Sequence, residues 1–568
     1  MIHSKVVAIA SFILLLFANT SHAQMMDYKV IATLNQTLYT SMSVVVDDIA
    51  YPLKSNSTYP IIFSGEAPIP KSGYRYAKTA NATGEQLLEP FLRSPQAIES
   101  TPHEFFNRTW NKHPNARIPQ VYSATSPRDR VVSSLHKDDE IPTIHFIANQ
   151  TALDLMHRSY LADPVTVDTT VSYISLKDAF QFKNVELSLS GRSSQLLAKL
   201  SYILKIQKKE SLFGYRRIKL RGLGFDPSYV REQMGYDILS SVGVASTEFS
   251  YVRVFMNDRE IGLFGLVEAF QNPWLANEFA GGDTSYKNGY LYQGTGAPSS
   301  AGDTSDLAYY ENNITAYAGG QYKVKEEADG ESKDNFQPLM DFTKFIAEAP
   351  VNTSDAAAVW NKTMDTEAFL RSMAVEILGG YSDGYIINNN NFFIYQNPKT
   401  QQYIYIPHDL DFCLGNTLTN ISRLSSGNYS AIWGWDQRPL IKRIMLVPEF
   451  KNRLVNLLQD LNKKLFNIDV VRPRIDDLAD MLQEDVAWDI TLPGVAQDTF
   501  DNLKQNIPEE FTSNPIIWDS TQRILKRIPV DEAINNLDSE TLTYMSLKQW
   551  FLVIHQNTAT FLSQLSPA

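Results

Sequence analysis

Carboxylates and side-chain amides gather on either side of a predicted β-hairpin in the second half of the chain. Asp383 and the asparagines at 388–391 precede one alternating run, and Asp409 and Asp411 follow a second. Residues 397–400 (NPKT) have the composition of the turn between them. A hairpin folded about this turn brings Asn391 opposite Pro407, within about 5 Å between Cα atoms. The acids and amides should therefore converge at one end of the hairpin.

Three carboxylates with several amide oxygens form the donor set of a hard cation, Mg²⁺ or Mn²⁺. His408, beside Asp409, could add a ligand, although a lone histidine there is more often a hydrogen-bonded loop residue. An acidic, turn-rich surface loop is the alternative interpretation of this stretch.

A basic region precedes this acidic one. Residues 192–221 contain nine Lys and Arg residues and one acid, Glu210, in a chain of net charge −12. The turn at 191–194 (GRSS) offers N–H groups and hydroxyls to phosphates, and alternation places Arg217, Lys219 and Arg221 on one strand face. A row of cations suits a polyphosphate. A solvated outer sheet face explains the composition equally well.

The elements that position these residues can be placed coarsely. Asp226 and Pro227 predict the N-cap and first residue of a helix running to about 242. A hairpin follows at 249–268, turning at Asn257 and ending in Glu268. Amphipathic helices are expected at 334–349 and 365–378, the second leading directly to Asp383, and further helices at 439–461, 470–485 and 544–565.

Length and composition favour a globular protein of more than one domain, with 568 residues, 43% hydrophobic and 20% charged. Residues 24–110 are β-rich and predict a small β-sandwich, and 111–140 predict a linker. The acidic balance argues against nucleic-acid binding.

Residues 1–23 have the pattern of a secretory signal peptide, with Lys5, an apolar run and a small-residue cleavage site. We expect no transmembrane segment and no GPI signal. The single cysteine, Cys413, excludes an intrachain disulfide. Ten N-x-S/T sequons predict a glycoprotein of the extracellular space or a cell or spore surface.

The order of parts is that of a protein-kinase-like phosphotransferase: a basic β region, an acid on a helix, and Asp and Asn loops that serve base and metal. The usual GxGxxGxV, VAIK and HRD strings are absent, so an atypical kinase is expected. A hydrolase has little support, since no G-x-S-x-G elbow is present.

The sequence resembles the CotH (spore coat protein H) family of secreted atypical protein kinases, and most of all its fungal spore and hyphal surface members. The matching stretches lie in order over residues 185–416. They are GRSSQLLAKLSYILKI, LRGLGFDPSYVREQMGYDILSSVGV, YVRVFMNDREIGLFGLVEAF, EAFLRSMAVEILGGYSDGYIINNNNFFIYQ and YIYIPHDLDFCLGN.

The resemblance implies an α+β, kinase-like fold with a β-rich N-lobe and a helical C-lobe over residues 141–480, extended by helices at 481–568. It implies Asp383 as catalytic base and Asn391, Asp409 and Asp411 as metal ligands. Lys205 or Lys219 would grip phosphate and pair with Glu232, and Glu268 would lie at the adenine edge. The implied phosphate turn contains Arg192, Ser193 and Ser194.

Two positions depart from the family pattern. Ser190 stands where the turn often has arginine, and Gln293 stands where the strand after Glu268 often has lysine. Both remove a cation near the expected phosphates.

The implied activity is transfer of the γ-phosphoryl group of ATP, with Mg²⁺ or Mn²⁺, to a protein on the cell or spore surface. A host-cell receptor is a further implied partner, and a monomer is expected. The alternative is a non-catalytic adhesin or coat scaffold that retains the fold.

Overall fold

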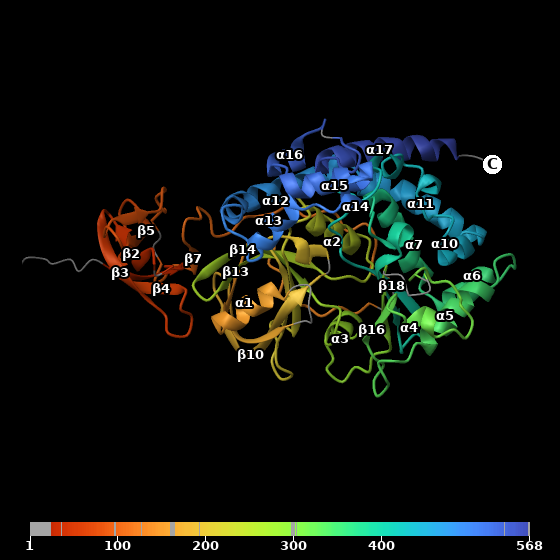
Figure 1. Ribbon diagram of the computed structural model, residues 1–568, viewed down its shortest axis with the longest axis horizontal. Helices are drawn as coiled ribbons and strands as arrows, with labels where there is room; N and C mark the ends of the chain where they lie inside the picture. The colour runs from red at the N-terminus through yellow and green to blue at the C-terminus, as the bar shows by residue number, and fades with distance from the viewer. Residues whose placement is uncertain are drawn as a thin grey trace, which may run out of the picture. The chain divides into compact units, whose positions relative to one another are not determined.

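The computed structural model describes residues 24–565 except 36, 96–97, 126–127, 160–164, 192, 297–301, 303 and 539 (Figure 1). The chain divides into two compact units between Thr109 and Trp110. Several sheets combine with many helices, which confirms the α+β class. The predicted signal peptide, 1–23, lies outside the described residues.

The first unit is a single sheet in the order β6-β5-β2-β3-β4-β1-β7. Its strands are β1 (Met25–Ile31), β2 (Tyr39–Val46), β3 (Ile49–Ser55), β4 (Ile62–Pro68), β5 (Tyr74–Ala80), β6 (Gln86–Leu88) and β7 (Glu104–Phe105). Tyr28, Tyr74 and Tyr76 are fully buried in its core. The strand β3 pairs with both β2 and β4 and so connects the strands into one sheet. The β-sandwich expected here, two sheets packed face to face, remains a prediction.

A closed barrel forms the first part of the second unit, in the order β10-β11-β12-β14-β13-β8-β9. Its strands are β8 (Thr143–Ile147), β9 (Thr166–Ile174), β10 (Ala179–Ser190), β11 (Ser201–Lys205), β12 (Arg217–Arg221), β13 (Phe249–Met256) and β14 (Arg259–Glu268). The predicted hairpin at 249–268 is confirmed as β13 and β14. Alternate apolar residues of the strands pack into one buried cluster, as the two-residue period requires.

A second, four-stranded sheet has the order β16-β15-β17-β18. Its strands are β15 (Leu291–Thr295), β16 (Tyr322–Glu326), β17 (Asn390–Gln396) and β18 (Tyr403–Pro407). The hairpin predicted around the acidic loops is β17 and β18. Its register differs by one residue from the expected one, because Phe392 rather than Asn391 pairs with Pro407. Asn391 instead accepts a backbone hydrogen bond from His408 at 3.0 Å.

Two helices carry site residues to the sheets. The helix α7 (Thr366–Gly379) follows its N-cap, Asp365, which is the first residue of the predicted helix, and ends at Gly380 in the left-handed conformation. The helix α2 (Arg231–Ser241) starts later than predicted. Its N-cap residue is Val230 rather than Asp226, whose carboxylate accepts hydrogen bonds from Ser228 and from the backbone N–H and guanidinium of Arg231.

The remaining helices enclose these elements. They are α1 (Gln150–Arg158), α3 (Trp274–Phe279), α4 (Thr315–Ala318), α5 (Gln337–Glu348), α6 (Ala356–Thr363), α8 (Tyr385–Asn388), α9 (Ile421–Leu424), α10 (Pro439–Ile444), α11 (Pro448–Lys464), α12 (Ile468–Asp489), α13 (Gln497–Gln505), α14 (Glu509–Thr512), α15 (Pro515–Lys526), α16 (Val530–Asn535) and α17 (Leu547–Gln564). The helix predicted at 439–461 is two helices, because Pro448 starts α11. In Figure 1, α12 lies beside β14 and α11 packs on α7.

Residues 111–140, predicted as a linker, contain no helix or strand among those described. The segment belongs to the second unit and bonds to the rest of it, through Ala116 to Asp477 and through Arg130 to Glu268 and Glu278. Among the described helices, none combines the length and the apolar composition of a membrane span.

Candidate active site

Asp383 lies in the short loop between α7 and α8, and three asparagine amides hold its carboxylate. Asn388 and Asn391 donate to it at 3.0 and 2.9 Å, and Asn390 donates at 3.2 Å. Burial raises the pKa of Asp383, and the amides partly counter this effect. The asparagine run predicted beside the acid therefore orients it.

Glu376 and Arg438 support the loop that carries Asp383. Glu376 accepts a hydrogen bond from the Ile386 N–H at 2.6 Å, and burial raises its pKa to about 8. Arg438 donates to the carbonyl groups of Ile386 and Ile387. Together they fix α8 from two sides.

Arg221, on β12 of the barrel, forms ion pairs with three carboxylates. Its guanidinium contacts Asp409 and lies 2.8 Å from Asp411 and 2.9 Å from Glu232 of α2. Lys219, two residues earlier, lies 3.5 Å from Asp409. The predicted pairing of Glu232 with a lysine is therefore wrong. Arg221 takes that place because its longer, forked side chain reaches three carboxylates at once.

These charges perturb one another strongly. Burial would lower the pKa of Arg221, but the surrounding carboxylates raise it well above its usual range. Burial opposes the ionisation of Asp409, yet Arg221 and Lys219 hold its pKa well below the ordinary value. Burial, with Asp409 and Glu232 nearby, raises the pKa of Asp411. Nearby cations therefore stabilise the ionised form of Asp409, whereas burial and neighbouring carboxylates disfavour the ionised form of Asp411.

The charge balance of this cluster fits a divalent cation. Four carboxyl groups, Asp383, Asp409, Asp411 and Glu232, interact with two cations, Lys219 and Arg221. The acids outnumber the two cations that they contact, and carboxylate and amide oxygens are the preferred donors of Mg²⁺ or Mn²⁺. Asp409 and Asp411 share Arg221 as their counter-ion in this structure.

A cavity of about 350 Å³ is lined both by the Asp383 loop and by the carboxylates around Arg221. This volume is typical of small-ligand sites. The cavity is lined by Asp383, Asn391, Asp409, Asp411, Glu232, Glu268, Lys219, Ser193 and Ser194, all predicted site residues. Arg192 lies outside the described residues. Lys205 is not among the lining residues, because it pairs across β10 and β11 with Glu186 at 2.7 Å.

The turn beside Ser193 depends on a glycine. Gly191 has φ +93°, and a Cβ there would lie 2.0 Å from the Ser194 hydroxyl. The Gln195 side chain donates to the Gly191 carbonyl at 2.7 Å. The turn is thereby held at the rim of the cavity, next to Ser190.

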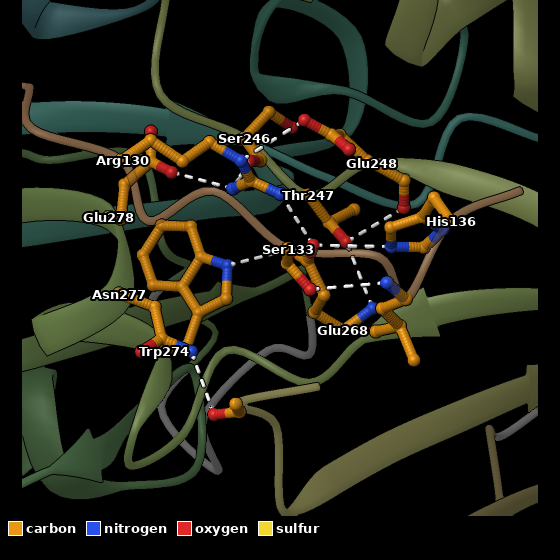
Figure 2. A network of polar contacts seen from close by, with 12 residues as sticks. Arg130, Ser133, His136, Ser246, Thr247, Glu248, Glu268, Trp274, Asn277 and Glu278 are labelled. Carbon is orange, nitrogen blue, oxygen red and sulfur yellow. Dashed lines mark hydrogen bonds and ion pairs between the residues drawn. The ribbon is translucent and has the colours of Figure 1, made fainter. Parts of the chain in front are cut away.

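Glu268 lies at the other end of the cavity and is surrounded by protein donors. Figure 2 shows Arg130, His136 and Trp274 converging on its carboxylate, with the Trp274 indole donating at 3.1 Å. Burial opposes ionisation, but Arg130 and His136 hold the pKa of Glu268 at about 2. Its carboxylate anchors the chain around Arg130, and reading an adenine edge remains a prediction.

His136, Glu248 and Glu268 also bring one ligand atom each within 4.8 Å of one another. Arg130 bonds both glutamates and so supplies the positive charge that a metal would bring (Figure 2). This group is therefore a structural ion-pair network.

Several lining residues were missed from the sequence. Arg221 was placed only within a row of cations, and Lys323 and Lys325 of β16 were not singled out. The strand alternation of YKVKE was the available signal for both lysines.

His408 lies among these groups and stays neutral. Its ring stacks on Phe393 with centroids 4.3 Å apart. Burial lowers the pKa of His408 to about 3; neighbouring Asp409 opposes this shift, and Lys219 adds to it.

With this geometry in view, comparisons with known proteins define the class. The family model described as CotH kinase protein matches residues 187–505, and the chain belongs to this family. The match contains the barrel strands β11 to β14 and both acidic loops.

Individual relatives are similar over most of the chain. Invasin CotH3 of Rhizopus delemar is 24% identical over 511 residues, covering 87% of this chain and 81% of the relative. Invasin CotH2 of the same fungus is 25% identical, covering 74% and 71%. Inner spore coat protein H of Bacillus subtilis is 23% identical, covering 59% and 83%.

One solved structure, the Helicobacter pylori proinflammatory kinase CtkA, was matched at 11% identity and a TM-score of 0.20. The match covers 54% of this chain and 95% of CtkA. A TM-score this low carries no weight for the fold.

Proposed function

We propose that this protein is a secreted atypical protein kinase that transfers the γ-phosphoryl group of ATP to a hydroxyl side chain of a surface or spore-coat protein. The observation that carries the proposal is the facing of Asp383 and the cluster of Lys219, Arg221, Asp409 and Asp411 around one cavity. The barrel would serve as the N-lobe and the helices after it as the C-lobe.

Asp383 is the proposed base. Its carboxylate is oriented by three amides, and burial raises its pKa, so it accepts a proton more readily than an exposed aspartate. The acceptor hydroxyl oxygen forms a bond to the γ-phosphorus and loses its proton to Asp383. The bond from that phosphorus to the β,γ-bridging oxygen breaks, and its electron pair leaves with ADP.

Asp411, Asp409 and Asn391 are the proposed metal ligands. Mg²⁺ or Mn²⁺ bound there would neutralise negative charge on the phosphates. Lys219 lies two residues from Arg221 on β12, and its ammonium group is aimed at the cavity beside Asp409. We assign it, rather than Lys205, the contact to phosphate.

The test is phosphate transfer from labelled ATP, with Mg²⁺ or Mn²⁺, to the protein itself or to an added protein. Wild type should incorporate label, and Asp383→Ala and Asp411→Ala should lose it. Asp334→Ala, which removes an exposed acid outside the cavity, is the matched control and should behave as wild type. Equal incorporation by wild type and Asp411→Ala would overturn the proposal.

A second candidate is a non-catalytic adhesin or scaffold on a spore or cell surface, with a host-cell receptor as one partner. The relatives named as invasins and spore coat protein favour it, as does Arg221, which already serves Asp409 and Asp411 as a counter-ion. ATP with Mn²⁺ should raise the melting temperature of a kinase and leave that of a pure scaffold unchanged.

A further inference from the structure

Two lysines of β16 lie on the cavity face of the four-stranded sheet. Lys323 is paired directly with Gln293 of β15, and Gln293 is paired with Phe393 of β17. Residues paired in this way have their side chains on the same face of an antiparallel sheet. Lys323, Gln293 and Phe393 therefore form a row across three strands, and all three line the cavity.

Lys325, two residues beyond Lys323, is the extra residue of a β-bulge, since Leu291 pairs with Glu326 and Tyr292 pairs with Val324. Tyr322 lies on the opposite face and is buried in the core, so the orientation of β16 is fixed. Lys325 also lines the cavity. Of the described carboxylates, none forms an ion pair with Lys323, which is exposed and lines the cavity.

Lys219 approaches the same space from the barrel. It lies beside Asp409, and His408, the residue before Asp409, is 3.4 Å from the Gln293 amide. Cations thus reach the cavity from both walls, from β12 and from β16. An anion located between them would contact both sheets.

We infer that Lys323 and Lys325 form, with Lys219, a binding site for the polyphosphate of a nucleotide. This inference rests on the proposed function. It assigns to Lys323 and Lys325 the positive charge near the phosphates that Gln293, being uncharged, does not supply. A polyphosphate matches the site because it spreads several negative charges over a length that can span two groups of cations. The competing explanation is that lysines on β16 only protect an edge strand from pairing with other chains.

The test measures nucleotide binding rather than transfer. Titration calorimetry of the full chain with Mn²⁺ and either ATP or adenosine would compare wild type with the double variant Lys323→Ala/Lys325→Ala. We expect ATP to bind the double variant roughly tenfold or more weakly, since charge-assisted contacts to phosphate are lost. Adenosine binding should be unchanged.

Two further variants test whether weaker ATP binding comes from the loss of positive charge at this position in the cavity. Lys333→Ala removes one positive charge from a neighbouring segment outside the cavity, where Lys333 lies 3.6 Å from Glu327, and should bind ATP as wild type does. Gln293→Lys, added to Lys323→Ala, returns a cation to the paired position and should recover ATP affinity.

The outcomes separate the two claims. If wild type binds ATP and the double variant binds it equally well, the lysines only protect the edge and this inference fails alone. A parallel loss of adenosine binding would mean disrupted folding and would also overturn it. If wild type binds no ATP, the proposed function fails and this inference fails with it.

Discussion

Replacing Glu376 by glutamine should make the stability of the protein less sensitive to alkaline pH. Glu376 is buried and has a pKa of about 8 in the folded protein, against 4.5 when it is exposed. Burial is the main cause, and Arg438 and the Ile386 N–H only partly offset it. Between these two values the folded state holds one more proton than the unfolded state.

The sign follows from this difference. The contribution of neutral Glu376 to stability is complete below pH 4.5 and is lost as pH rises to about 8. At about 1.4 kcal/mol for each pH unit, the loss is on the order of 5 kcal/mol. Glutamine cannot ionise and keeps an acceptor for the Ile386 N–H. The variant should therefore match wild type near pH 5 and exceed it by several kcal/mol at pH 8.5.

Urea unfolding followed by tryptophan fluorescence between pH 3 and 8.5 measures this difference and also covers the pH range below 4.5 in which the control titrates. Glu367→Gln is a control of opposite sign. Despite partial burial, Arg453 and Arg371 lower the pKa of Glu367, so its stabilisation is present at neutral pH and lost on acidification. A difference between Glu376→Gln and wild type that does not change with pH would refute the reasoning.

Three other substitutions test the supports of the fold and site. Arg93→Met leaves Glu89 and Glu104 buried without their counter-ion and should destabilise the first unit by about 3–5 kcal/mol in urea unfolding. Arg75→Met, which removes a 3.9 Å surface ion pair, is the control, and an equal loss of stability in both variants would contradict the prediction. Arg231→Met should cost a similar amount in the second unit, because Asp226 then stays buried and unpaired; an unchanged urea midpoint would show that the pair is dispensable. Gly434→Ala should lower both the melting temperature and phosphate transfer, since its Cβ would lie 1.9 Å from the Ile386 carbonyl oxygen. Gly330→Ala, at φ +81° with open space around its Cβ, is the control for backbone strain. Equal effects of the two substitutions would show that the contact with Ile386 is not the cause.

The local parts of the site could be predicted from the sequence. Alternating residues and the NPKT turn indicated β17 and β18, and the hairpin then brought both acidic loops to one cavity. The helix predicted at 365–378 from its amphipathic pattern matches α7 to within one residue, and the structure gives it Asp365 as N-cap and Gly380 as a left-handed C-cap.

The long-range parts could not be predicted. Arg221 meets Asp411 across 190 residues, and Lys323 meets Gln293 only through the pairing of β15 and β16. Such contacts depend on strand order, which short-range patterns do not encode. Asp226 looked like a helix cap, but Arg231 provides its stronger, charged partner.

The central claim is that Asp411, Asp409 and Asn391 hold a divalent cation opposite Asp383 in a phosphate-transfer cleft. Crystals soaked with Mn²⁺ and a non-hydrolysable ATP analogue would test it by anomalous diffraction. We expect a manganese peak at these residues, with phosphates beside Lys219. A nucleotide-bound crystal without manganese there, or with manganese only at His136, Glu248 and Glu268, would contradict it.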